Sequence, residues 1–63
     1  MTTTAMARLE MAVIAAHNDI YDWLTAREPG FVGTAPAHLL TAAHAAEAAL
    51  HAARAAATKA RMH

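Results

Sequence analysis

The helix-breaking residues of this chain are confined to one short stretch, because both glycines and both prolines lie between positions 29 and 36. Pro29 disfavours helical backbone at the residue before it, and Gly30 readily adopts a positive φ. A helix that reaches this stretch must therefore end there. Since no glycine or proline interrupts the chain on either side, the sequence predicts two long helices joined by a single corner, an all-α helical hairpin.

The expected boundaries follow from the same stretch. Pro36 is tolerated in the first turn of a helix, so we expect the second helix to begin there, capped by Thr34 or Ala35. The apolar Phe31 and Val32 are expected to fold back onto the helix ends. The 63 residues are too few for more than one domain. This single domain comprises a helix over 3–26, a corner over 27–35 and a helix over 36–61.

The first helix carries an apolar stripe. Its members are spaced alternately by three and four residues, which is the repeat of a helix face and of a heptad seam. They are Met6, Leu9, Val13, Ala16, Ile20 and Trp23. Asn18 and Asp19 complicate this pattern, because both are favourable N-cap residues. The sequence allows either one continuous helix or two helices with a break near Asn18.

The second helix is dominated by alanine, the residue with the highest helix propensity. A second stripe with heptad spacing runs along it and consists of Leu39, Ala43, Ala46, Leu50, Ala53, Ala57 and Ala60. Such a seam lets helices approach closely but buries little apolar area. The chain has no cysteine, so no disulfide can support this small core. We therefore expect the core to be completed by homo-oligomerisation or by docking on a protein partner.

Composition restricts the class of protein. Five acidic and five basic residues balance, whereas a nucleic-acid-binding domain usually carries a basic excess. No apolar run approaches the ~18 residues of a membrane-spanning helix, and the first ten residues do not resemble a secretory signal. We expect a cytoplasmic protein, bacterial or phage-encoded, that binds neither membranes nor nucleic acid.

Histidines and a carboxylate on the second helix raise the question of a metal site. His44, Glu47 and His51 lie near one helix face, but a zinc or di-iron site needs three or four ligands in suitable positions. The chain contains neither Cys nor Ser, the commonest nucleophiles. The sequence predicts no enzyme activity, no catalytic residue, no cofactor and no metal site. It leaves open whether the three residues meet across an interface between chains.

Two groups of residues are candidates for contact with a protein partner. Large apolar residues off the main stripe are suited to act as anchors, and these are Met11, Ile14 and Tyr21. Basic residues near the end of the second helix complement the helix dipole and can also orient a partner. These are Arg54, Lys59 and Arg61.

The stretch from Trp23 to Leu40 holds the only Trp and the only Phe of the chain. The corner of a hairpin with a small core explains these residues in structural terms. The stretch also resembles the toxin-binding domain of Xre/MbcA/ParS-type antitoxins, and the resemblance covers about residues 17–52. The matching positions are Trp23, Leu24, Pro29, Phe31, Gly33, Pro36, Leu39 and Leu40.

This resemblance implies a protein that binds and neutralises a RES-type toxin, which consumes NAD. Two departures from the family are visible. The residues before the motif are too few for the N-terminal DNA-binding domain that many members carry. The helix after Leu40 also continues, whereas the family tends to have a Gly that ends a short helix. The alternative function is a small self-assembling structural protein, such as a virion component or an assembly scaffold, and a third hypothesis is a small DNA-associated factor.

Overall fold

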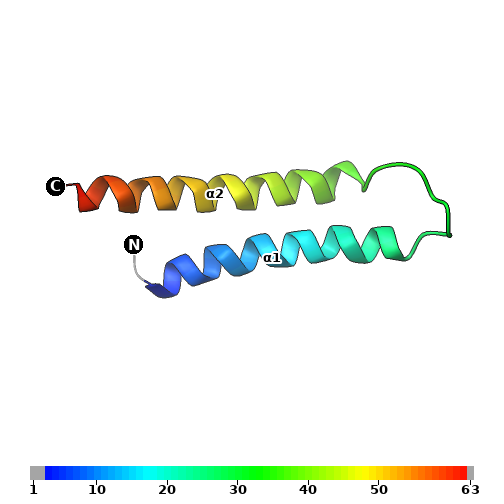
Figure 1. The fold of residues 1–63 in the computed structure, drawn as a ribbon, viewed down its shortest axis with the longest axis horizontal. Coiled ribbons are helices and arrows are strands. Elements are labelled where there is room, and N and C mark those ends of the chain that lie inside the picture. The colour runs from blue at the N-terminus through cyan, green and yellow to red at the C-terminus, as the bar shows by residue number, and fades with distance from the viewer. Residues whose placement is uncertain (1–2, 63) are drawn as a thin grey trace.

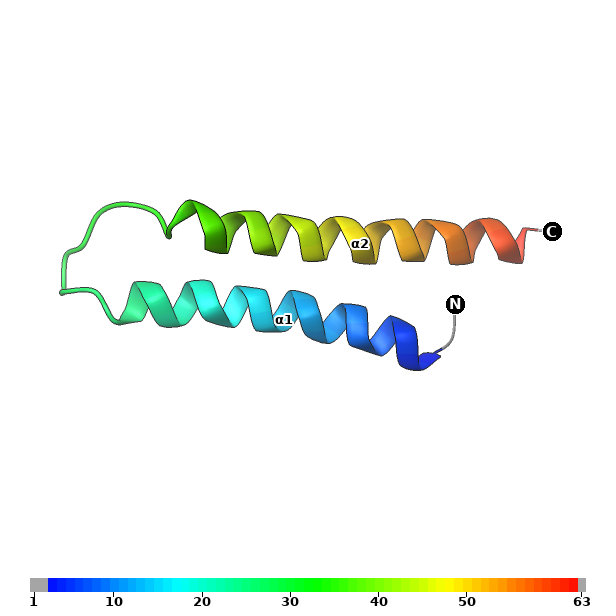
Figure 2. The ribbon, with the colours of Figure 1, turned by 180° about the vertical axis from the view of Figure 1, so that it is seen from behind.

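The computed structural model describes residues 3–62, which form two α-helices. Helix α1 spans Thr3–Thr25 and helix α2 spans Ala37–Arg61. The helices lie antiparallel and in contact, and one loop joins them, as the two opposite views of Figures 1 and 2 show. We call the end with this loop the corner, and the other end the open end. The predicted all-α hairpin is confirmed, and neither described helix is apolar enough over a sufficient length to cross a membrane.

Helix α1 is continuous through Asn18, so the alternative with a break at that position is wrong. Asn18 and Asp19 are exposed. Each costs at most ~0.7 kcal/mol in intrinsic helix propensity relative to alanine. The apolar stripe continues on both sides of them, and its members Ala16 and Ile20 are half-buried. Packing of the stripe against α2 therefore outweighs the tendency of Asn18 to start a new helix.

The two stripes predicted from the sequence form the contact between the helices. All six members of the α1 stripe are half-buried. In the α2 stripe, the buried members are Ala43, Leu50 and Ala53, and the half-buried members are Leu39, Ala46 and Ala57. Ala60 is exposed, because the two helices diverge toward the open end (Figure 1). The heptad spacing thus identified the packed surface of both helices, except for the last turn of α2.

Two glycines shape the corner. Gly30 has a φ of 85°, and the N–H of Phe31 donates to the carbonyl of Glu28 at 3.0 Å, which closes a tight turn. Gly33 has a φ of 154°, and a Cβ atom at this position would lie 3.0 Å from the ring atom Cζ of Phe31. Both positions favour glycine, the first through its backbone angle alone and the second also through the close approach of the aromatic ring.

The predicted start of the second helix needs a correction. Pro36 itself occupies the N-cap position, instead of Thr34 or Ala35, and no side chain caps the helix. The carbonyl of Pro36 accepts the N–H groups of Leu39 at 3.0 Å and Leu40 at 3.2 Å. Pro36 fits because an N-cap residue has non-helical backbone, and its φ of −56° and ψ of 149° are angles that the proline ring allows.

The core of the hairpin is thin. Its buried residues among those described are Ala35, Ala43, Leu50 and Ala53, so Leu50 is the only large one. The accessible surface is 4948 Å² for a mass of 6.6 kDa, whereas a compact monomer of this mass exposes about 3,900 Å². The radius of gyration is 15.2 Å, against about 11 Å for a compact domain of this length. The isolated hairpin therefore leaves much more surface in water than a globular protein does.

Candidate interaction surface

We call the contact between the α1 stripe and the α2 stripe the seam. Two polar pairs link the helices along one side of it. His17 Nε2 lies 2.5 Å from Glu47 Oε1, and Arg54 Nη2 lies 3.7 Å from Glu10 Oε1. Within each helix the two members are seven residues apart, so they occupy equivalent heptad positions. All four side chains are about half exposed. The pairs mark one broad side of the hairpin, which we call the paired face.

Apolar side chains continue the paired face on α1. Ile14 follows Glu10 by four residues and Tyr21 follows His17 by four, so each shares a helix side with that polar residue. Ile14 is 58% exposed and Tyr21 is 67% exposed. Leu24 lies three residues beyond Tyr21 and extends the same line. On this face α1 therefore presents both polar and apolar side chains, with heptad spacing.

The third anchor that the sequence suggested lies elsewhere. Met11 is exposed to the same degree as Tyr21, at 66%. It falls midway between Leu9 and Val13 of the apolar stripe, and therefore on the side of α1 opposite the seam. The structure thus places Ile14 and Tyr21 on one face and leaves Met11 on the outer edge of the hairpin.

Helix α2 contributes a matching line to the paired face. Its members are Leu40, His44, Glu47, His51 and Arg54. Three of these were the candidate metal ligands, but Glu47 pairs with His17 of the other helix instead. Within residues 3–62 no group of three potential ligand side chains is positioned to hold a metal ion. A site shared between chains stays a hypothesis.

The three basic residues near the open end do not form one patch. Arg54 pairs with Glu10 on the paired face, and Arg61 follows it by seven residues on the same side. Lys59 lies two residues before Arg61 and therefore on another side of α2. Lys59 and Arg61 both fall in the last turn of the helix, where their charges complement the helix dipole.

Trp23 is the centre of the packing at the corner. Its ring meets that of Phe31 edge-on, with centroids 5.7 Å apart and planes inclined at 73°. The guanidinium of Arg27 lies 4.3 Å from the centre of the Trp23 ring, and Arg27 Nε donates to the Trp23 carbonyl at 3.1 Å. Val32 is 93% exposed, so the expectation that it folds back onto the helix ends is wrong. Leu39 at the start of α2 is half-buried.

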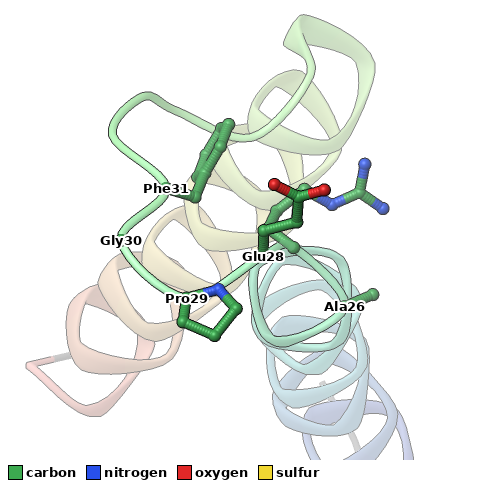
Figure 3. A pocket seen from close by; sticks show the side chains of 6 residues that line it. Ala26, Glu28, Pro29, Gly30 and Phe31 are labelled. Carbon is green, nitrogen blue, oxygen red and sulfur yellow. The ribbon is translucent and has the colours of Figure 1, made fainter.

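A hollow of about 540 Å³ lies beside the corner. It is lined by six consecutive residues, from Ala26 to Phe31, and Figure 3 shows the labelled side chains spread around the bend of one loop. Because every lining residue comes from this single segment, the hollow is the concave side of the loop, without an opposing wall. A small-molecule site usually needs walls from several elements.

Sequence reasoning did not single out His17 or Glu10, although each pairs with a residue of the other helix. The heptad pattern contained the necessary signal. Both residues directly follow a stripe member on α1, and Glu47 and Arg54 directly follow stripe members on α2. In an antiparallel pair of helices, such equivalent flanking positions face one another. Combining the two stripes with the hairpin topology would have predicted that these flanking positions face one another, whereas the partner of each residue depends on the register of the helices.

Comparison with known proteins assigns the chain to no family. No family model matches the chain, and no curated protein and no solved structure is significantly similar to it. The resemblance of Trp23–Leu40 to the antitoxin domain therefore stays a prediction.

Proposed function

We propose that this chain is a non-catalytic protein–protein interaction module, whose hairpin completes its core against a protein partner. The observation that carries the proposal is the excess of exposed surface over that of a compact monomer, together with exposed Ile14 and Tyr21 beside the seam. Burying a large apolar side chain stabilises a protein by about 1.5–3 kcal/mol. A partner on the paired face supplies that burial.

Within this function we favour a small self-assembling structural protein. The long uninterrupted α2 and the extent of the molecule, 52 × 18 × 16 Å, suit a rod that packs lengthwise in a bundle. An antitoxin-like corner, in contrast, is expected to be followed by a short helix. The lack of cysteine fits the cytoplasm of a bacterium or of a phage-infected cell, where disulfides are rare.

The experiment that tests this function is thermal unfolding of the isolated chain, followed by circular dichroism over about a hundredfold range of concentration. A module that needs a partner is expected to be loosely folded when dilute, and to gain helicity and a higher midpoint when concentrated or when its partner is added. Cooperative unfolding of a monomer at a midpoint independent of concentration would contradict the proposal.

The second candidate is an antitoxin-like module that neutralises a RES-type toxin. The packing of Trp23, Phe31 and Arg27 favours it, because this packing fixes the corner that carries the resemblance. The test is NAD consumption by a purified RES-domain enzyme in the presence of the chain. Inhibition at equimolar ratio, lost in Phe31→Ala and retained in Met11→Ala, is the expected result. Undiminished NAD consumption would remove this candidate.

A further inference from the structure

We propose that the partner on the paired face is a second copy of this chain, lying antiparallel to the first, so that the pair forms a four-helix bundle. This inference rests on the proposed interaction function and specifies its occupant and its orientation. It is carried by the distribution of charge along the hairpin, by the size of the paired face and by the position of its apolar side chains.

Folding into a hairpin separates the charges of the chain by sign along its long axis. Ile14 is the middle residue of α1 and lies level with Leu50 of α2, as the facing pairs Glu10–Arg54 and His17–Glu47 show. The open half, residues 3–13 and 51–62, has a formal net charge of +3 from Arg8, Glu10, Arg54, Lys59 and Arg61. The corner half, residues 15–49, has a net charge of −3 from Asp19, Asp22, Arg27, Glu28 and Glu47.

This separation selects the orientation of a second copy. Helices in a bundle pack with their axes about 8–10 Å apart, which is close to the screening length at physiological ionic strength. Part of this charge lies away from the paired face, because Arg8, Asp19 and Asp22 directly precede members of the α1 stripe. The paired face itself carries a net charge of +1 in the open half, from Glu10, Arg54 and Arg61, and of −1 in the corner half, from Glu47. In an antiparallel pair, the positive open half of each copy lies against the negative corner half of the other. In a parallel pair, halves of like charge lie together. A copy of the same chain is therefore electrostatically complementary to itself in only one of the two lengthwise arrangements.

The paired face has the area that a stable dimer requires. The molecule is 52 Å long and 18 Å wide, so a broad face covers roughly 900 Å². A stable interface buries about 800 Å² on each partner. Side-by-side packing over the length of the hairpin reaches this value, whereas contact through the corner or the open end alone does not.

The apolar side chains of the paired face are placed for a two-fold interface. Ile14 at the middle of α1 lies near the axis that relates two antiparallel copies, so each copy presents the same residue there. Tyr21 lies seven residues toward the corner and meets the open half of the other copy. Among the described residues, the opposite broad face carries no large exposed apolar side chain, since its positions are mainly alanine. The paired face is therefore the side that a second copy covers.

The first test compares the dissociation constant of the dimer, measured by sedimentation equilibrium, between charge-introducing variants. Ile14→Lys combined with Tyr21→Lys is expected to raise the dissociation constant at least about a hundredfold, because one lysine enters the centre of the interface and the other meets the positive open half of the second copy. Met11→Lys is the matched control, since Met11 is as exposed as Tyr21 on the same helix but faces away. It is expected to change the constant less than about threefold. Equal effects of the two variants overturn the proposed face.

The second test measures orientation. The chain has no cysteine, so Val32→Cys provides a single attachment site for a spin label at the exposed corner. In the antiparallel dimer the two labels lie near opposite ends, and electron paramagnetic resonance is expected to give a distance close to the 52 Å length of the hairpin. A distance below roughly half that length would show a parallel pair and overturn the proposed orientation.

These outcomes separate the inference from the function on which it rests. A chain that stays monomeric and loosely folded when concentrated, yet folds on a foreign protein, overturns the second copy and leaves the interaction function intact. A monomer that unfolds cooperatively, with a midpoint independent of concentration, contradicts both. A dimer that is weakened by Ile14→Lys with Tyr21→Lys and retains the long label distance supports both.

Discussion

Replacement of Leu50 by alanine tests the account of the core most sharply. Leu50 is the only large side chain that is buried among the described residues, with 8% of its surface exposed. It lies at the middle of the contact between α1 and α2. The other buried positions of α2 are alanines, which offer little apolar area to compensate for its loss.

The expected loss is about 2–3 kcal/mol. Truncation of a buried leucine to alanine costs about 2–5 kcal/mol, and the low end applies where the surroundings can relax into the space. The seam here is open to solvent on the flank of the polar pairs, since all four of their side chains are about half exposed. A stable domain of 63 residues has about 3–9 kcal/mol in total, so this single change removes a large share of the stability.

The assay is urea unfolding followed by circular dichroism, with all variants at one concentration, because association would otherwise shift the midpoint. Met11→Ala removes a side chain of similar size from an exposed position and is expected to stay within about 0.5 kcal/mol of the parent chain. Leu50→Met keeps the volume and is expected to lose less than about 1.5 kcal/mol. If Leu50→Ala and Met11→Ala are destabilised equally, the seam is not the core of the protein.

Three further changes probe the corner and the paired face. Gly33→Ala is expected to lower the free energy of unfolding by about 1–2 kcal/mol, because the new methyl group pushes against the ring of Phe31. It is also expected to change the fluorescence of Trp23, because the Phe31 ring packs against that of Trp23. In Gly30→Ala the new methyl group meets open space, so the free energy of unfolding is expected to fall by about 1 kcal/mol through the positive φ alone. The emission spectrum of Trp23 is expected to stay unchanged in this variant, and a spectral shift would contradict the assigned packing of the corner. A double-mutant cycle of His17→Ala and Glu47→Ala is expected to give a coupling free energy of about 0.2–1 kcal/mol, as for other exposed pairs, and a zero coupling would argue against the register of the two helices.

The sequence predicted the fold well where one physical effect dominated. The corner was predicted correctly because the helix-breaking glycines and prolines all lie in one stretch. The alternating spacing of the stripes identified the packed sides of both helices. Each helix boundary in the structure lies within one residue of the expected one. Such signals are local, because backbone restriction by Pro29 and helical periodicity act within a few residues.

Prediction from the sequence failed for those features of the structure that depend on contacts between segments far apart in the chain. The N-cap tendency of Asn18 is a local signal, and packing against α2 overrides it. Val32 looks like a core residue by composition, but the turn at Gly30 directs it into solvent while Phe31 reaches Trp23. The partner of His17 depends on the register of the helices, which spacing within one helix does not determine.

Small-angle X-ray scattering of the unmodified chain tests the central claim most directly, because it gives mass and shape in one measurement. For two hairpins packed side by side about 10 Å apart, we expect twice the 6.6 kDa chain mass and a radius of gyration of about 16 Å, hardly above the 15.2 Å of one hairpin. Twice the mass with a radius near 30 Å would indicate end-to-end association through the corner or the open end. That result, or a folded particle of a single chain mass, would contradict the claim that a second copy covers the paired face.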